Sequence, residues 1–297
     1  PVDFHLDALE KLGAKIELKN GYIEATSKKL VGCEINFPGV SVTGTENIMM
    51  AAVLAKGQSV LRNVAKEPEV EDLANFLNSM GAQINGAGTD EIIINGVEAL
   101  DGAEFSIPAD RIEAGTYLIA AAITGGDVTI SNVQAHRMNN ILDKLKLSGA
   151  SINVGKDNIH LIMENDSILP VDISTAPFPG FPTDMQAQFT VLNALSEGSS
   201  VVTENVFENR FMHVQELNRM GCDITVKGSN AFVKGVNSLN GAPVMATDLR
   251  ASASLILAGL CAKGETIVDR IYHIDRGYER IEEKLSYLGA DITRLPN

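Results

Sequence analysis

The stretch Met80-Gly81-Ala82-Gln83-Ile84 decides the fold of this 297-residue chain, because close variants of it recur along the sequence. The other copies are Leu12-Gly13-Ala14-Lys15-Ile16, Ser148-Gly149-Ala150-Ser151-Ile152, Met220-Gly221-Cys222-Asp223-Ile224 and Leu288-Gly289-Ala290-Asp291-Ile292. Their glycines are 68, 68, 72 and 68 residues apart. A fixed period of this length indicates a supersecondary unit that is repeated along the chain.

Each copy follows an amphipathic helix and precedes a β-hairpin. In the helix before Gly81 the apolar residues have helical spacing, and the glycine supplies a left-handed cap. The hairpin strands are predicted at 82–85 and 91–94, 150–154 and 159–163, and 222–226 and 231–233. Apolar helices are predicted at 51–55, 118–123 and 252–262, and short β-branched strands at 59–61, 128–130, 200–202 and 266–268. Because these helices are apolar nearly all round, we expect helices enclosed by sheets.

The ends of the chain fit the repeat incompletely. Only 12 residues precede Gly13, only 297 − 289 = 8 follow Gly289, and the first residue is Pro1. We therefore expect the C-terminal portion of a longer polypeptide.

Charge and composition disfavour several classes of protein. The chain has 24 basic and 38 acidic side chains, a formal net charge of −14 and 45% apolar residues. This composition is typical of a globular protein, and the net charge disfavours nucleic acid, which is held by Lys and Arg against phosphate. No apolar stretch reaches the roughly 20 residues that span a bilayer, and no export signal opens the sequence. We expect a cytoplasmic protein without membrane insertion.

The cysteines and histidines predict neither a metal site nor a cofactor. Cys33, Cys222 and Cys261 form no CxxC pair and are odd in number, so we expect free thiols that pack as small buried hydrophobes. The five histidines show no zinc-binding spacing. The Gly86-Ala87-Gly88 step lacks the third glycine of a dinucleotide fingerprint, and we interpret it as a hairpin turn.

Arginine is concentrated in the last third of this acidic chain. The arginines Arg210, Arg250, Arg270, Arg276 and Arg280 all fall within 71 residues. Guanidinium groups suit bidentate recognition of phosphate and carboxylate, so the cluster is a candidate site for a small, highly charged anion.

A simpler interpretation stays open for the same segments. Asp110, Asp184 and Asp248 begin apolar helices, where a carboxylate can cap free N–H groups and do no more. On this view Arg210 and Arg276 are solvated loop residues, paired with the neighbouring carboxylates Glu208 and Asp275.

Four motifs carry a resemblance to a known family. They are Phe181-Pro182-Thr183-Asp184-Met185-Gln186-Ala187-Gln188, Glu208-Asn209-Arg210-Phe211-Met212-His213, Ala246-Thr247-Asp248-Leu249-Arg250-Ala251-Ser252-Ala253-Ser254-Leu255 and Ile271-Tyr272-His273-Ile274-Asp275-Arg276-Gly277-Tyr278-Glu279-Arg280-Ile281-Glu282. With them the chain resembles the UDP-N-acetylglucosamine enolpyruvyl transferases from Pro1 to its C-terminus. The resemblance implies an α/β fold of two inside-out α/β barrel domains, each built of three repeats. Residues 1–108 would then be the C-terminal part of the first domain, and residues 109–297 a second domain that lacks its closing N-terminal strand.

The resemblance also implies a reaction and its substrates. Enzymes of this family transfer the enolpyruvyl group of phosphoenolpyruvate to the 3-hydroxyl of UDP-N-acetylglucosamine and release phosphate, the first committed step of peptidoglycan synthesis. By the match of motifs, Asp184 is the base at that hydroxyl and Asp248 lies near the reacting carbons. Arg210, Arg250 and Arg276 hold the carboxylate and phosphate groups.

Nucleotide contacts are expected from three places in the chain. Besides Val206 they are Pro1, Val2, Asp3, Phe4 and His5 at the start, and Val40, Ser41, Val42 and Thr43 further on. Gly39 stands where many relatives have a basic residue, and Thr43 where glycine is common. The family's catalytic cysteine loop belongs upstream of Pro1, so we expect that segment to be required for turnover and give none of the three cysteines its role.

Two other functions remain alternatives. A shikimate-pathway enolpyruvyl transferase shares the architecture and phosphoenolpyruvate, although the long motif at residues 271–282 favours the nucleotide-sugar enzymes. An inactive relative that binds UDP-N-acetylglucosamine in a regulatory role is the second alternative.

Overall fold

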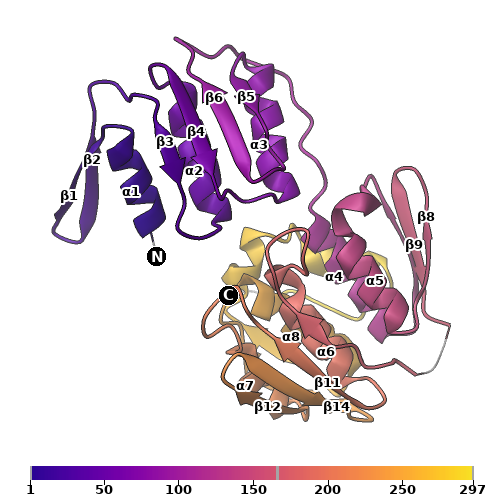
Figure 1. The fold of residues 1–297 in the computed structure, drawn as a ribbon. Coiled ribbons are helices and arrows are strands. Elements are labelled where there is room, and N and C mark those ends of the chain that lie inside the picture. Colours follow the sequence, from indigo (N-terminus) through magenta and orange to yellow (C-terminus); the bar gives the residue numbers. More distant parts are fainter. Residues whose placement is uncertain (1, 165–166, 296–297) are drawn as a thin grey trace. The chain divides into compact units, whose positions relative to one another are not determined.

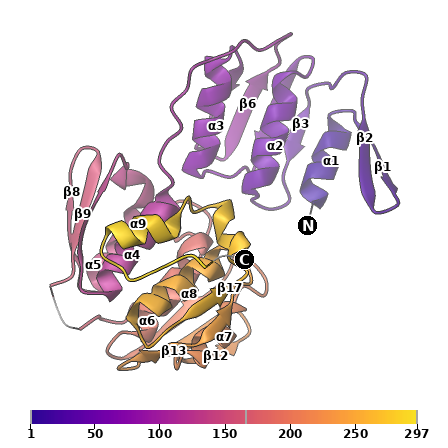
Figure 2. The same cartoon turned by 180° about the vertical axis from the view of Figure 1, so that it is seen from behind.

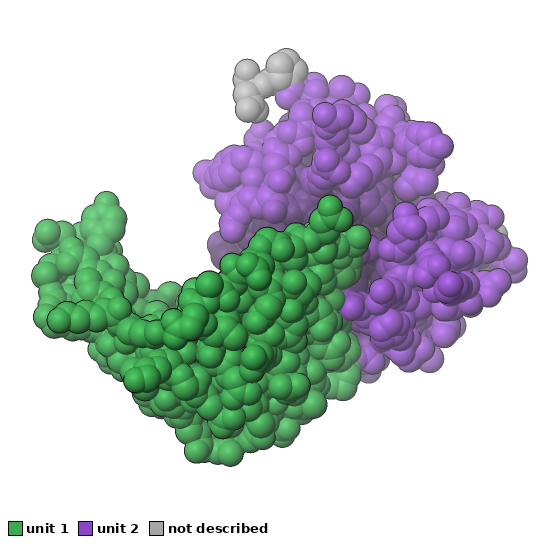
Figure 3. Space-filling view, turned by 90° about the horizontal axis from the view of Figure 1, so that it is seen from above, with its two compact units in different colours: residues 1–108, 177–179 green, residues 109–176, 180–297 purple. Residues whose placement is uncertain are grey.

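The structure is a computed structural model that describes residues 2–164 and 167–295. It divides into two compact units, which Figure 3 shows in different colours. Among the described residues, the first unit comprises 2–108 and 177–179, and the second comprises 109–164, 167–176 and 180–295. Each unit is described by itself below.

The first unit combines helices with two sheets (Figure 1). Its helices are α1 (Asp3–Lys11), α2 (Val42–Val53) and α3 (Pro68–Ser79). Strands β1 (Lys15–Lys19) and β2 (Tyr22–Thr26) form an antiparallel pair. A second sheet has the order β3 (Glu34–Asn36), β4 (Gln58–Arg62), β6 (Glu91–Asn95), β5 (Gln83–Asn85). In it β3 is parallel to β4, and the other neighbours are antiparallel.

The second unit contains helices α4 (Arg111–Ile123), α5 (Asn139–Leu147), α6 (Gln186–Ala194), α7 (His213–Arg219), α8 (Leu249–Cys261) and α9 (Ile281–Tyr287). Short 3-10 helices are η1 (Ala135–Met138), η2 (Thr183–Met185) and η3 (Ile271–Arg276). Its sheets have the orders β7 (Asp127–Ser131), β9 (Asn158–Ile162), β8 (Ser151–Val154) and β10 (Ile173–Ser174), β11 (Ser199–Thr203), β13 (Asn230–Lys234), β12 (Asp223–Lys227). Two parallel pairs join β14 (Leu239–Asn240) to β16 (Ala262–Lys263) and β15 (Pro243–Met245) to β17 (Ile267–Asp269).

The predicted repeat is confirmed in the caps and in the sheets. The glycines of all five copies have φ between +96° and +106°. After α3, the N–H groups of Gly81 and Ala82 donate to the carbonyls of Asn78 and Leu77, each at 3.0 Å, which is the expected left-handed cap. The order and directions of β3-β4-β6-β5 return in β10-β11-β13-β12.

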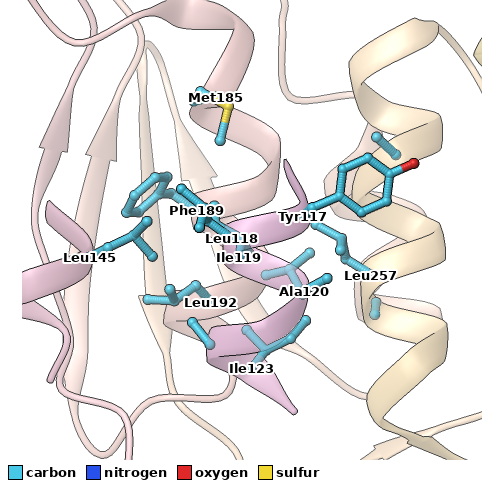
Figure 4. Close-up of a cluster of buried hydrophobic side chains, with 14 of the residues drawn as sticks. Tyr117, Leu118, Ile119, Ala120, Ile123, Leu145, Met185, Phe189, Leu192 and Leu257 are labelled. Carbon is cyan, nitrogen blue, oxygen red and sulfur yellow. The ribbon is translucent and has the colours of Figure 1, made fainter. Parts of the chain in front are cut away.

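Three apolar helices form the core of the second unit. Helices α4, α6 and α8 contact one another, and each also contacts its own strands: β7 and β9, β11 and β13, and β17. Figure 4 shows Leu118 of α4, Phe189 and Leu192 of α6 and Leu257 of α8 within one cluster, and all four side chains are at most 1% exposed. Figure 2 shows the unit from the side of α8, α9 and β17.

The cysteines are free thiols, as predicted, but their burial differs from the expectation. Cys222 is buried, whereas Cys33 and Cys261 are only partly covered. Burial raises the pKa of Cys222 to about 12 and that of Cys261 to about 11, which keeps both thiols protonated at neutral pH. Within the described ranges, no helix is long and apolar enough to span a bilayer.

The backbone of Ala55 packs closely against Gly96. Gly96 follows β6, and a Cβ atom there would lie 1.7 Å from the carbonyl oxygen of Ala55. We predict that Gly96→Ala lowers the free energy of unfolding by about 1–3 kcal/mol, the usual cost of overpacking, measured by urea denaturation. The control is Gly102→Ala, where nothing lies within 4 Å of the added atom and stability should be unchanged. Equal stability of the two variants would contradict the prediction.

Candidate active site

Two arginines from different elements of the second unit bind one carboxylate. Asp184 lies in η2 directly before α6, Arg210 precedes α7, and Arg250 is the second residue of α8. Nη2 of Arg210 lies 2.8 Å from Oδ1 of Asp184. Nε and Nη2 of Arg250 lie 3.1 Å and 3.0 Å from Oδ2. The two carboxylate oxygens are therefore divided between two guanidinium groups.

This arrangement sets the charge state of Asp184. Burial on its own would raise the pKa of the carboxyl, but the charges and hydrogen bonds of Arg250 and Arg210 outweigh it and lower the pKa. Burial likewise opposes the charge on Arg250, and the Asp184 carboxylate raises the pKa of that guanidinium. Asp184 is therefore ionised, and it is a weak base while both arginines hold it.

A buried polar network supports Arg250. Its guanidinium carbon lies 5.6 Å from the centroid of the Tyr278 ring, and the Tyr278 hydroxyl lies 2.9 Å from Oγ1 of Thr116 on α4. Nε2 of Gln188, on α6, donates to the same Thr116 oxygen at 3.1 Å. Nη1 of Arg250 is buried and has no hydrogen-bond partner among the described residues. The arginine is thus positioned from the core.

Arg210 is held by the loop that carries it and by the neighbour of Asp184. Its Nη1 donates to Oγ1 of Thr183 at 2.7 Å, and its guanidinium carbon lies 4.8 Å from the centroid of the Phe207 ring. Behind Thr183 lies Glu204, which is 3% exposed and accepts a hydrogen bond from the Thr183 hydroxyl. Glu204 does not stand out in the sequence, although it follows the predicted strand at 200–202 and Thr203.

Asp248 caps helix α8, as the sequence predicted. Its Oδ1 accepts hydrogen bonds from the backbone N–H groups of Arg250 and Ala251, at 2.8 Å and 3.0 Å. The neighbouring His213 is fully buried, and this burial lowers its pKa to about 4 despite the opposing effect of the Asp248 charge. The imidazole is therefore neutral at pH 7. Asp110 caps α4 in the same way as Asp248 caps α8.

The simpler interpretation of the charged segments is wrong at three residues. Asp184 does not cap a helix, because its oxygens bind arginines. The partner of Arg210 is Asp184 and not Glu208. Asp275 binds Arg294, at 2.6 Å and 3.1 Å, and not Arg276. Proximity in the sequence suggested the wrong ion pairs, because folding brings oppositely charged residues together that are more distant along the chain.

Of the five predicted catalytic residues, the structure brings Arg210 and Arg250 together around the carboxylate of Asp184. Asp248 caps the helix that carries Arg250. Arg276 is exposed at the end of η3, and none of the contacts described for Asp184 involves it. The next residue, Gly277, packs closely against helix α8, since a Cβ atom there would lie 2.9 Å from the side chain of Leu249.

The predicted nucleotide-binding segments at the start of the chain lie next to each other in the first unit. Asp3, Phe4 and His5 open α1, preceded by Val2, and Ser41 caps α2, which begins with Val42 and Thr43. Nε2 of His5 lies 3.5 Å from Oγ1 of Thr43, and Phe4 packs beside Gly39. Val2 and Val40 are 48% and 43% exposed. Pro1 lies outside the described residues. Val206, in the second unit, donates its N–H to Glu204.

Comparison with known proteins assigns the family. A family profile described as EPSP synthase (3-phosphoshikimate 1-carboxyvinyltransferase) matches residues 1–285. The UDP-N-acetylglucosamine 1-carboxyvinyltransferase of Coxiella burnetii strain Dugway 5J108-111 is 59% identical over 296 residues, which cover 99% of this chain and 68% of that protein. The chain belongs to the EPSP synthase family. This finding confirms the resemblance to the enolpyruvyl transferases that the four motifs carry.

Two solved structures agree with the fold. The crystal structure of the enolpyruvyl transferase NikO from Streptomyces tendae matches 98% of this chain and 72% of that chain, with a TM-score of 0.89 and 27% identity. A 2.37 Å structure of EPSP synthase from Acinetobacter baumannii covers 98% of this chain and 71% of its own, with a TM-score of 0.75 and 21% identity. The second likeness shows the fold alone.

The pairing of Asp184 predicts a pH-dependent contribution to stability. Because its pKa is lower in the folded state, the stabilisation is present above the unfolded carboxyl pKa, about 3.9. It is lost as the pH falls through the folded pKa. We expect Asp184→Asn to be less stable than the parent at pH 6 and the gap in unfolding free energy to shrink as the pH is lowered from 5 to 2.

The measurement is urea denaturation of both proteins at each pH. Asp291→Asn, at an exposed position, is the control, and its unfolding free energy should stay close to that of the parent at every pH. A gap for Asp184→Asn that stays constant down to pH 2 would contradict the prediction.

Proposed function

We propose that this protein transfers the enolpyruvyl group of phosphoenolpyruvate to the 3-hydroxyl of UDP-N-acetylglucosamine and releases phosphate, the first committed step of peptidoglycan synthesis. The observation that carries the proposal is the convergence of Arg210 and Arg250 on the carboxylate of Asp184. These three residues lie in three of the four motifs that carry the family resemblance. The chain is 59% identical to a UDP-N-acetylglucosamine 1-carboxyvinyltransferase. Phosphoenolpyruvate carries a carboxylate and a phosphate, and both groups suit guanidinium donors.

The degree of similarity favours the nucleotide-sugar substrate over shikimate 3-phosphate. The relatives named UDP-N-acetylglucosamine 1-carboxyvinyltransferase are 59% identical to this chain, and the EPSP synthase structures are 20% and 21% identical. The lower values support a shared architecture without a shared acceptor. The inactive, regulatory alternative is addressed by the assay below.

The site supports a base at Asp184 whose strength depends on the bound substrate. In the ligand-free arrangement the two guanidinium groups lower the pKa of Asp184. The anionic groups of phosphoenolpyruvate would compete for the same guanidinium donors. As the arginines turn to the substrate, the pKa of Asp184 rises and the carboxylate becomes a better acceptor for the hydroxyl proton.

The chemistry then follows an addition and an elimination. The sugar 3-oxygen loses its proton to Asp184 and forms a bond to C2 of phosphoenolpyruvate, while the C2–C3 double bond takes up a proton from solvent at C3, which gives a tetrahedral intermediate. In the second step C3 returns a proton to solvent, the bond from C2 to the phosphate oxygen breaks, and the double bond is restored in the product. The departing phosphate takes the proton that Asp184 holds. Arg210, Arg250 and Arg276 are proposed to hold the charged groups in both steps, and Asp248 to lie near the reacting carbons.

The remaining assignments concern the nucleotide and the architecture. The adjoining segments at residues 2–5 and 40–43, together with Val206, are proposed to contact the uridine diphosphate, as is Pro1. Each unit is proposed to be part of an inside-out α/β barrel domain. In the second unit this is supported by three mutually packed helices that each contact separate strands.

Asp184→Ala tests the catalytic assignment. In the natural full-length protein we expect kcat for phosphate release to fall by about 10²–10⁴-fold, the usual contribution of a general base. Binding of UDP-N-acetylglucosamine, measured by calorimetry, should change little. Asp223→Ala, at an exposed strand position, is the control and should retain turnover. Retained turnover in Asp184→Ala would exclude Asp184 as the base.

The parent protein separates the alternative functions in the same assay. Phosphate release with UDP-N-acetylglucosamine and phosphoenolpyruvate supports the proposal. Release only with shikimate 3-phosphate would support the shikimate-pathway activity, and binding of the nucleotide sugar without release would support the inactive relative.

A further inference from the structure

We propose that Glu204 is a positioning residue, which fixes Arg210 against Asp184 by orienting Thr183 and the Phe207 segment. Its carboxylate is 3% exposed and lies directly after β11. What the site binds rests on the proposed function. The hydrogen-bond network around Glu204 does not depend on that proposal.

The Glu204 carboxylate accepts hydrogen bonds from four groups. Oε1 accepts from Oγ1 of Thr175 at 2.9 Å and from the backbone N–H groups of Val206 and Phe207 at 2.9 Å and 3.0 Å. Oε2 accepts from Oγ1 of Thr183 at 2.8 Å. An ionised carboxylate is acceptor-only, so all four donors are matched by the same group. A buried charge with this many charge-assisted bonds is a rigid junction between β11, η2 and the Arg210 loop.

The other repeats show that the fold does not need a carboxylate at this position. The backbone N–H of Glu204 donates to the carbonyl of Ser229, the residue before the second hairpin strand. In the two other repeats with this hairpin, Val64 donates to Asp90 and Val133 donates to Asp157, again directly before the second strand. Both valines are buried, at 1% and 2% exposure. The third repeat makes this hydrogen bond from Glu204, directly after its strand, whereas the other two make it from a buried valine that follows an asparagine with positive φ (Asn63 and Asn132).

The hydroxyl of Thr183 connects the Glu204 carboxylate to the Arg210 guanidinium group. A threonine hydroxyl has one hydrogen, and here Glu204 accepts it, so a lone pair remains for Nη1 of Arg210 at 2.7 Å. The N–H of Phe207 is fixed by the same carboxylate, and the Phe207 ring lies 4.8 Å from the Arg210 guanidinium carbon. Glu204 thus sets both contacts that hold Arg210 beside Asp184.

The ionisation of Asp184 reports on this arrangement. The charged groups that bind it are Arg210, from the loop before α7, and Arg250, from α8. Tyr278 lies behind Arg250, and His213, which is neutral at pH 7, lies near Arg210. If Arg210 loses its fixed position, its part in lowering the pKa of Asp184 is lost, while the contribution of Arg250 remains.

Glu204→Gln tests the proposal with almost no change of shape. An amide presents N–H groups on one side, so it cannot accept from all four donors. In full-length protein with ¹³C-labelled aspartate, we expect the Asp184 carboxyl, assigned with Asp184→Asn, to titrate about one pH unit higher than in the parent. Thr183→Val replaces the hydroxyl with a methyl group of similar size and should produce a similar shift. The double variant should add little to either, because both changes break one connection.

Asn193→Ala is the matched structural control. Asn193 is a buried polar residue of the same unit, and its side chain bonds the backbone of Val171 and no site residue. This variant should lower the unfolding temperature without moving the Asp184 titration. A Glu204→Gln protein that loses stability but titrates at Asp184 like the parent would overturn the proposal. If Glu204→Gln does not fold, an unshifted titration in Thr183→Val would also overturn it.

Turnover provides the second measurement and keeps the two proposals apart. In an active protein, Glu204→Gln should lower kcat/KM for phosphoenolpyruvate about tenfold, equivalent to 1.4 kcal/mol, and leave KM for the nucleotide sugar near its parent value. An unchanged kcat/KM for phosphoenolpyruvate would count against the proposal. If the parent itself does not release phosphate, the proposed function fails, yet the Asp184 titration still tests the role of Glu204.

Discussion

Helices α4, α6 and α8 have almost no exposed face, and the need to bury them on nearly all sides is the constraint on which the second unit depends. Every residue of α6 is buried, as are those of α8 from Ala251 to Ala258. Helices of this kind pack against one another and still require cover on their outer faces. The separate strand groups beside each helix supply that cover, and the capping glycines end the outer helices so that the hairpins can form.

The buried helices also dictate where charge can lie. Side chains along α6 and α8 are enclosed, so charged groups are confined to the ends of these helices and to the loops that precede them. Asp184 stands before α6, and Asp248 and Arg250 stand at the start of α8. The core reaches the site through uncharged polar groups, since Thr116 and Gln188 lie in the helices and bond Tyr278 beneath Arg250. Packing and site geometry are consequently parts of one arrangement.

Local patterns predicted most of the fold but only part of the site. Helix caps, hairpins and the repeat depend on neighbouring residues, and the sequence therefore indicated them correctly, including the caps at Asp110 and Asp248. Ion pairs depend on groups that are distant in sequence, such as Asp184 with Arg250, and only the family resemblance placed those two residues in one site. Asp275 was assigned the wrong partner because Arg294 is brought to it by the end of the chain. Glu204 was missed because a single glutamate after a strand resembles a surface residue until its four donors are seen.

The starts of α6 and α8 meet at Asp184, and this meeting gathers cationic groups at one point of a chain whose net charge is negative. Helix N-termini carry a partial positive charge, which here adds to two guanidinium groups, while the whole chain carries −14. A dianion therefore meets repulsion at a distance and attraction at contact. Salt screens the distant part over about 8 Å at physiological ionic strength. Moderate salt should accordingly speed the encounter with such a ligand, the reverse of its effect on proteins that steer their ligands by net charge.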